Sequence, residues 1–115
     1  MKEMTFAEAL CLGITECLDA DARVTLINSG FGGLTPHRAS YNVIREKYAD
    51  RITDAPISEL GYCGIGIGAA MTGLRPIVAL GTSAFSFEAW PQILNEAAIT
   101  CYGSRGQVTV PVVFH

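Results

Sequence analysis

The chain has 115 residues, of which half are apolar, and this is enough for one domain with a single core. Its formal net charge of −3, without a basic run, argues against nucleic acid or an anionic membrane as a partner, and no apolar stretch approaches the ~20 residues of a membrane span. The four cysteines lack C-x-x-C spacing and the first residues lack the apolar segment of a signal peptide, so we expect reduced, mostly packed thiols in a cytoplasmic protein.

Hydrophobic periodicity and turn residues divide the sequence into alternating helices and strands. In chain order, the predicted elements are a helix over residues 6–20, a strand over 23–30, a loop over 31–40, a helix over 40–51, an extended segment over 52–56, a glycine-rich helix that stops at Gly73, a strand over 75–81, a helix from about Pro91 to Gly103, and a strand over 107–115. Strands separated by helices predict a three-layer α/β fold, in which a mostly parallel sheet has helices on both faces.

The segment SELGYCGIGIGAAMTG contains five glycines, four inside a predicted helix and one at its end. Each glycine in a helix interior costs ~1 kcal/mol relative to alanine, so a close backbone contact should compensate. Gly61, Gly64 and Gly68 share one face and predict such a contact, either inside the domain or with a partner chain. The run GIGIGAA does not follow a strand, no acid ends the next strand, and no lysine follows the glycines, which argues against nicotinamide and phosphate-loop sites.

Glu59 stands at the head of this helix and is the candidate catalytic residue. It could be a solvated acid that the helix macrodipole favours. However, its sequence neighbours are largely apolar: Pro56, Ile57, Leu60 and Tyr62. A carboxyl held among apolar groups exchanges a proton more readily near neutral pH and can act as an acid or base.

The last predicted strand is strongly apolar and should have a neighbour on each side, yet the sequence ends at His115. We therefore expect residues 1–115 to form one domain that is incomplete at its C-terminus, either as a fragment or with another chain over the exposed strand.

The spacing E-x-x-x-x-G-Φ-x-x-G, with Φ apolar, is met by Glu59, Gly64, Ile65 and Gly68 and resembles the pyrimidine-side motif of thiamine-diphosphate enzymes. The strings DAPISELGYCGIGIGAAMTGLRPIV, AFSFEAWPQILNEAA and GQVTVPVVF are similar to the beta subunit of 2-oxo acid dehydrogenases of the pyruvate and branched-chain kind. The resemblance runs from about Met4 to the end and implies a transketolase-like pyrimidine-binding domain with thiamine diphosphate as cofactor.

The resemblance also implies roles for individual residues. Glu59 would hydrogen-bond a ring nitrogen of the cofactor's aminopyrimidine, Phe85 would stack on the pyrimidine, and Ile57 would join the cofactor-binding site. The alternative for Phe85 is a plain core residue. The glycine face of the helix after Glu59 would pack at a subunit interface. The implied reaction is oxidative decarboxylation of a 2-oxo acid with acyl transfer to a lipoyl group.

The resemblance also implies partner proteins, because the sequence lacks one of the family's binding motifs. The family's G-D-G and N motif for diphosphate and magnesium is absent, so an alpha-type subunit would hold both, and the isolated chain would be inactive. A homodimer mate and a lipoyl transacylase are the other implied partners. His37 and His115, the two histidines, receive no catalytic role. The alternatives are a transketolase-like enzyme acting on sugar phosphates and a non-catalytic truncated domain that only assembles with partners.

Two departures from the family pattern stand out. The family commonly has GED or GEE after its first strand, where this sequence has Asn28–Gly30, so an acid that would link two active sites is missing. The family's DQ pair is replaced by Pro91 and Gln92. Both changes leave Glu59 chemistry possible and put communication between sites in doubt.

Overall fold

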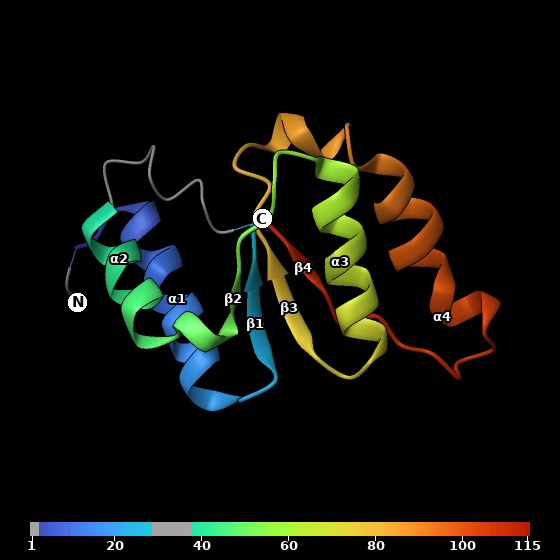
Figure 1. Cartoon of the computed structure of the whole chain (residues 1–115), viewed down its shortest axis with the longest axis horizontal. Helices are drawn as coiled ribbons and strands as arrows, with labels where there is room; N and C mark the ends of the chain where they lie inside the picture. The colour runs from blue at the N-terminus through green and yellow to red at the C-terminus, as the bar shows by residue number, and fades with distance from the viewer. Residues whose placement is uncertain (1–2, 29–37) are drawn as a thin grey trace.

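A computed structural model describes residues 3–28 and 38–115 (Figure 1). Its elements in chain order are α1 (Phe6–Ala20), β1 (Val24–Ile27), α2 (Arg38–Lys47), η2 (Ala49–Arg51), β2 (Ile52–Thr53), α3 (Glu59–Met71), β3 (Arg75–Val78), η3 (Ser83–Ser86), η4 (Gln92–Ala98), α4 (Ile99–Gly103) and β4 (Val113–Phe114). The predicted order of helices and strands is confirmed. Most of the loop predicted over 31–40 lies outside the described residues, and α2 begins two residues earlier than expected.

The strands form one parallel sheet in the order β2-β1-β3-β4. The longest pairing joins β1 to β3, with Val24 opposite Arg75 and Ile27 opposite Val78. The chain leaves β1 toward β2 on one side and later adds β3 and β4 on the other side, so the topology switches direction between β1 and β3. In open α/β sheets, ligands bind beyond the carboxyl ends of the strands at such a point.

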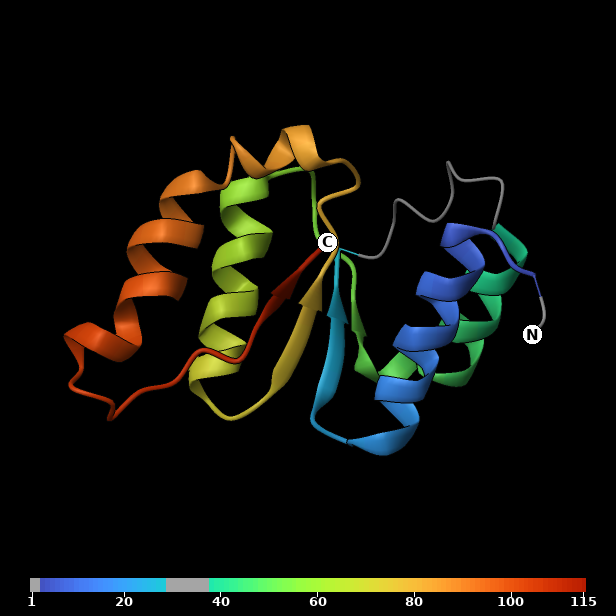
Figure 2. The same cartoon turned by 180° about the vertical axis from the view of Figure 1, so that it is seen from behind.

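Helices cover both faces of the sheet, as predicted. Figures 1 and 2 show α1 and α2 on one side of the strands and α3 with α4 on the other. Alternation along β1 sends Val24 and Leu26 into a cluster with α1 and α2, and sends Ile27 into a second cluster with α3. The second cluster contains Ile27, Tyr62, Cys63, Val78, Leu80 and Ala89.

Side-chain caps define the ends of α1 and α3. Thr5 and Glu8 form the predicted capping box at the start of α1. Ser58 caps α3, because its hydroxyl oxygen accepts a hydrogen bond from the Gly61 N–H at 3.2 Å. Gly73, with a φ of 102°, ends α3 in a Schellman motif, in which the Leu74 N–H donates to a carbonyl five residues earlier.

Two predicted elements near the C-terminus take a different form. The helix from Pro91 is wound as the π-helix η4 before it becomes α4. The strand predicted over 107–115 is wrong for most of its length, because pairing with β3 begins only at Val113. Pro111 has no N–H for a ladder, and the Val112 N–H donates to the Val110 carbonyl in a tight turn around this proline.

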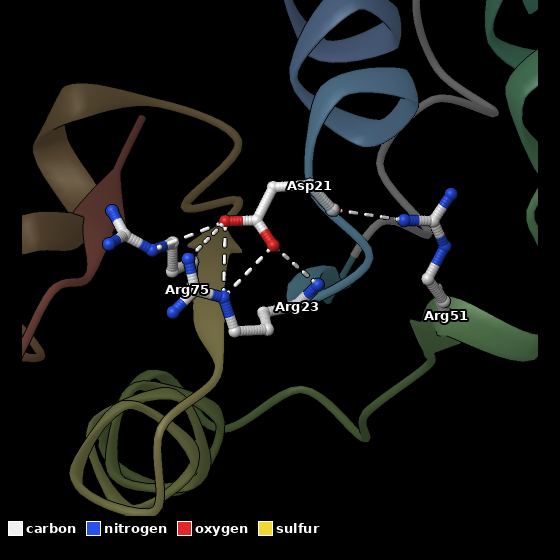
Figure 3. A network of polar contacts seen from close by, with 4 residues as sticks. All are labelled: Asp21, Arg23, Arg51 and Arg75. Atoms are coloured by element: carbon white, nitrogen blue, oxygen red, sulfur yellow. Dashed lines mark hydrogen bonds and ion pairs between the residues drawn. The ribbon is translucent and has the colours of Figure 1, made fainter.

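An ionic network ties together the amino-terminal edge of the sheet (Figure 3). The Asp21 carboxylate binds the guanidinium of Arg23 at 2.7 Å and that of Arg75 at 3.4 Å. Arg51 donates to the backbone carbonyls of Leu18 and Asp21. Hydrogen bonds from Arg23 lower the pKa of Asp21 to about 2. The network therefore fixes the end of α1 to the starts of β1 and β3, on the edge opposite the strand tips.

The thiols are only partly packed, contrary to expectation. All four cysteines are free, but only Cys63 is buried, Cys11 is half-buried, and Cys17 and Cys101 are exposed. Among the described residues, no helix is both long and apolar enough to cross a membrane.

Candidate functional site

The carboxyl ends of β1 and β3 meet the start of α3 at the switch point of the sheet. Asn28 follows β1 directly, Ala79 follows β3, and Glu59 is the first residue of α3. Backbone hydrogen bonds hold the ends of the strands together beyond the formal ladder, since the Ala79 N–H donates to the Ile27 carbonyl at 3.0 Å. A ligand at this edge would face groups from three separate elements.

Asn28 is buried at this edge in an uncommon backbone conformation. Its φ of 58° is left-handed, which glycine, asparagine and aspartate adopt more readily than other residues. Its N–H donates to the Thr53 carbonyl at 2.9 Å, and its side-chain Nδ2 donates to the Ala79 carbonyl at 2.9 Å. Asn28 thereby joins the ends of β2, β1 and β3, and its amide group stays fixed inside the molecule.

Glu59 lies half-buried at the first position of α3. The macrodipole of the helix favours a negative charge there. The apolar surroundings expected from its sequence neighbours are largely absent, because Pro56 is exposed, Ile57 is 88% exposed and Leu60 is 47% exposed. Tyr62, which is buried, lies one turn further along the helix.

Tyr62 and Cys63 form the inner wall of this region. Tyr62 is 1% exposed, and burial, followed by the negative charge of Glu59, raises its pKa to about 12. The side chains of Glu59 and Asn28 are close enough to influence this pKa, but neither reaches the Tyr62 hydroxyl with ordinary hydrogen-bond geometry. Burial and the charge of Glu59 also raise the pKa of the Cys63 thiol, to about 11.

The two apolar residues expected at the cofactor site lie at the surface. Phe85 belongs to η3, which lies beside the N-terminal end of α3 in Figures 1 and 2. Its side chain is 36% exposed, so Phe85 is not the plain core residue of the alternative interpretation. Ile57 precedes the cap of α3 and is almost fully exposed. Both side chains have exposed apolar surface, and their roles toward a cofactor stay predictions.

The glycines of α3 do not all serve the same purpose. A Cβ atom at Gly64 or Gly68 would meet nothing within 4 Å, so the predicted close contact is not made inside the domain at these positions. Gly61 faces the cap, where a Cβ would lie 2.9 Å from the Ser58 hydroxyl oxygen. The close approach occurs at Gly66, where a Cβ would lie 2.4 Å from a methyl group of Val78. The i, i+3, i+7 pattern missed Gly66, because this contact is made with the sheet.

Sequence reasoning also missed the functional potential of Asn28 and Tyr62. In the sequence, Asn28 stands out only as a departure from the family pattern, and the other two residues of that departure, at positions 29 and 30, lie outside the described residues. Tyr62 was counted as an apolar neighbour, although its position three residues after Glu59 places both on one side of a helix. Within the described ranges, no group of three or more His, Cys, Asp or Glu side chains could hold a metal ion.

Comparisons with known proteins agree with the resemblance expected from the sequence. Residues 2–115 match the model of the family described as transketolase, pyrimidine binding domain. The chain is 43% identical to the mitochondrial pyruvate dehydrogenase E1 component subunit beta-1 of Oryza sativa subsp. japonica, over 98% of this chain and 30% of that protein. It is 43% identical to the corresponding beta subunit of Bos taurus and 42% identical to that of Homo sapiens, in each case over 97% of this chain and 32% of the relative.

The chain spans about a third of the length of the curated relatives that it matches. Each of these relatives is named as a mitochondrial protein, so the expectation of a cytoplasmic location is wrong. The absence of a recognisable signal peptide said nothing about import into an organelle, and this is where the inference from the first residues failed.

Proposed function

The chain belongs to the transketolase pyrimidine-binding domain family, and we propose that it is the pyrimidine-binding part of a thiamine-diphosphate-dependent 2-oxo acid dehydrogenase. The observation that carries this proposal is the position of Glu59. A half-buried carboxylate begins a helix at the switch point of a parallel sheet, where ligands of such folds bind.

The described residues fit an aminopyrimidine ring. Such a ring has polar nitrogens at its edge and a flat face, and it calls for one acid and an apolar cover. Glu59 would hold a proton at a carboxyl oxygen for exchange with a ring nitrogen. Phe85 and Ile57 offer exposed apolar side chains that would cover the ring. When bound, thiamine diphosphate supplies the nucleophilic carbon that attacks the carbonyl of the 2-oxo acid.

We further propose that an alpha-type subunit completes the site. The diphosphate and its magnesium need a cationic or acidic binding set, and the part of the chain that the structure describes contains no cluster of metal-binding side chains. A lipoyl transacylase would then receive the acyl group. The names of the relatives, which are beta subunits of a pyruvate dehydrogenase E1 component, support this division of labour.

A second copy of the chain is the proposed partner for the outer face of α3. Gly64 and Gly68 are open toward solvent, and the apolar side chains of Leu60, Ile65 and Met71 beside them are between 39% and 50% exposed. Bulk at Gly68 should prevent close approach of another helix, so Gly68→Leu should weaken any oligomer that sedimentation detects. A monodisperse monomer at micromolar concentration would contradict this role.

The test of the proposed function is reconstitution with an alpha-type chain that carries the diphosphate-binding motif. Decarboxylation of pyruvate and of branched 2-oxo acids is followed with an artificial electron acceptor. Glu59→Gln should slow turnover by ~100-fold or more, because glutamine keeps the size of the side chain but cannot exchange the proton. Glu16→Gln, on the exposed side of α1, is the matched control and should leave turnover unchanged.

Two outcomes would contradict the proposal. Unchanged turnover of the reconstituted Glu59→Gln enzyme would remove Glu59 from the mechanism. If no alpha-type chain gives activity even with the unmodified protein, a role in assembly alone would account better for the architecture of the site.

A further inference from the structure

We propose that Tyr62 is a positioning residue for Glu59, whose hydroxyl donates a hydrogen bond to the Glu59 carboxylate and accepts one from the Asn28 side-chain amide. The proposal rests on the proposed function for its catalytic meaning, since it concerns the same acid. Its structural part, a polar relay from Asn28 through Tyr62 to Glu59, stands on the geometry of this chain.

The first support is the environment of the Tyr62 hydroxyl. The side chain is 1% exposed and packs among Ile27, Val78 and Leu80. Its hydroxyl oxygen has no hydrogen-bond partner of ordinary geometry within the described part of the chain. Buried polar groups in folded proteins nearly always have a partner, and a phenylalanine would fill the same volume without a polar atom. A hydroxyl retained in this place calls for a partner close by.

The second support is the set of groups around that hydroxyl. Tyr62 lies three residues after Glu59 on α3, so both side chains are on one side of the helix. The side chains of Glu59 and Asn28 both influence the pKa of Tyr62, and Cys63 is the other titratable neighbour. Both titratable neighbours belong to α3, and Asn28 at the end of β1 carries no charge. A carboxylate only accepts hydrogen bonds, and an asparagine NH₂ group only donates them. The hydroxyl must therefore donate toward Glu59 and accept from Asn28.

The third support is the fixed amide of Asn28. One hydrogen of its Nδ2 is used on the Ala79 carbonyl, and its backbone N–H is used on the Thr53 carbonyl. The second Nδ2 hydrogen is left for another acceptor on the same buried side. Glycine would adopt the φ of 58° at this position with less strain, but it would bring no amide. The side chain of Asn28 thus supplies the anchored end of the relay.

Nuclear magnetic resonance of the full chain tests the relay without cofactor or partner. The chain is labelled with ¹³C at the tyrosine Cζ, and Tyr62→Phe assigns the Tyr62 signal. As the pH is lowered and Glu59 is protonated, the Tyr62 signal should move in a step, and this step should vanish in Glu59→Gln. Tyr102, which is 89% exposed, should show no step. Cys63 does not titrate in the acid range because its pKa is about 11. A flat Tyr62 signal in the unmodified chain, or a step that persists in Glu59→Gln, overturns the proposal.

Activity of the reconstituted enzyme tests the positioning role. Tyr62→Phe should lower kcat by ~10-fold and leave KM nearly unchanged, since the ring keeps its place and only the hydroxyl is lost. Asn28→Gly, which tolerates the backbone conformation, should lower kcat in the same direction. Tyr102→Phe is the matched control. An unchanged kcat in Tyr62→Phe overturns the positioning role. If the Tyr62 signal shows the step but no reconstitution gives activity, the result counts against the proposed function and not against the contact between Tyr62 and Glu59.

Discussion

Replacement of Gly66 by alanine should destabilise the chain, whereas the same replacement at Gly68 should stabilise it. A Cβ atom at position 66 would lie 2.4 Å from a Val78 methyl group and 3.6 Å from a methyl group of Ile27. Carbon atoms pack best at about 3.5–4.0 Å, so the first contact must open by more than about 1 Å. Val78 is fully buried against α3, so either its side chain or the helix must shift to relieve this contact.

The magnitude follows from two opposing effects. Alanine in a helix interior is favoured over glycine by about 1 kcal/mol. Overpacking of a well-filled core typically costs about 1–3 kcal/mol. Gly66→Ala should therefore lose up to about 2 kcal/mol of unfolding free energy, whereas Gly68→Ala, with nothing within 4 Å of its new Cβ, should gain up to about 1 kcal/mol.

Urea unfolding followed by circular dichroism measures both free energies, at two protein concentrations to detect any effect of association. In the double variant with Val78→Ala, the clash disappears, so the combined loss should be smaller than the sum of the single losses by about 1 kcal/mol or more. If Gly66→Ala is as stable as Gly68→Ala, the close packing of α3 on β3 is not as described.

Three further changes probe the cap of α3, the ionic network and the thiols. Ser58→Ala should lower the unfolding free energy by about 1 kcal/mol, because a backbone N–H of the first turn loses its acceptor, and Ser58→Asp should restore it. An arginine partner holds the pKa of Asp21 at about 2, below its ordinary 3.8, so its contribution to stability is complete above pH 4 and is lost as the pH falls toward 2. The thermal midpoint should fall less over this range in Asp21→Asn, and an equal fall in both proteins would refute the assignment. Iodoacetamide should modify Cys17 and Cys101 rapidly and Cys63 only on unfolding, as mass spectrometry of peptides would show, since burial keeps the Cys63 thiol protonated and covered.

The elements of the fold could be predicted where local chemistry decides them. The capping box at Thr5 and Glu8 and the glycine that ends α3 are local signals, and the structure confirms both. The alternation of helices and strands was enough to predict a parallel sheet with two covered faces. The last strand was predicted too long because its apolar run continues through Pro111, whose missing N–H delays pairing until Val113.

In the candidate site too, features that depend on a local motif could be predicted, whereas contacts between residues distant in sequence could not. Glu59 could be proposed as the candidate acid because its motif lies within ten residues of sequence. The contact of Asn28 with Ala79 joins residues 51 positions apart, and its existence depends on the adjacency of β1 and β3. Which glycine of α3 approaches another element depends on the rotation of the helix on the sheet, and no spacing rule for helix pairs contains that rotation.

These contacts give a physical reason for the many glycines of α3. A helix with so many glycines has little intrinsic stability, so tertiary packing must hold it in place. Gly66 allows close contact with Val78 on the inner side, and Gly64 and Gly68 leave the outer side open. The first residue of the same helix is Glu59, and its proposed role needs a carboxylate that stays fixed relative to the ends of β1 and β3. Docking of α3 on the sheet therefore determines both the stability of this half of the domain and the position of its candidate acid, and a variant that lifts the helix should impair both together.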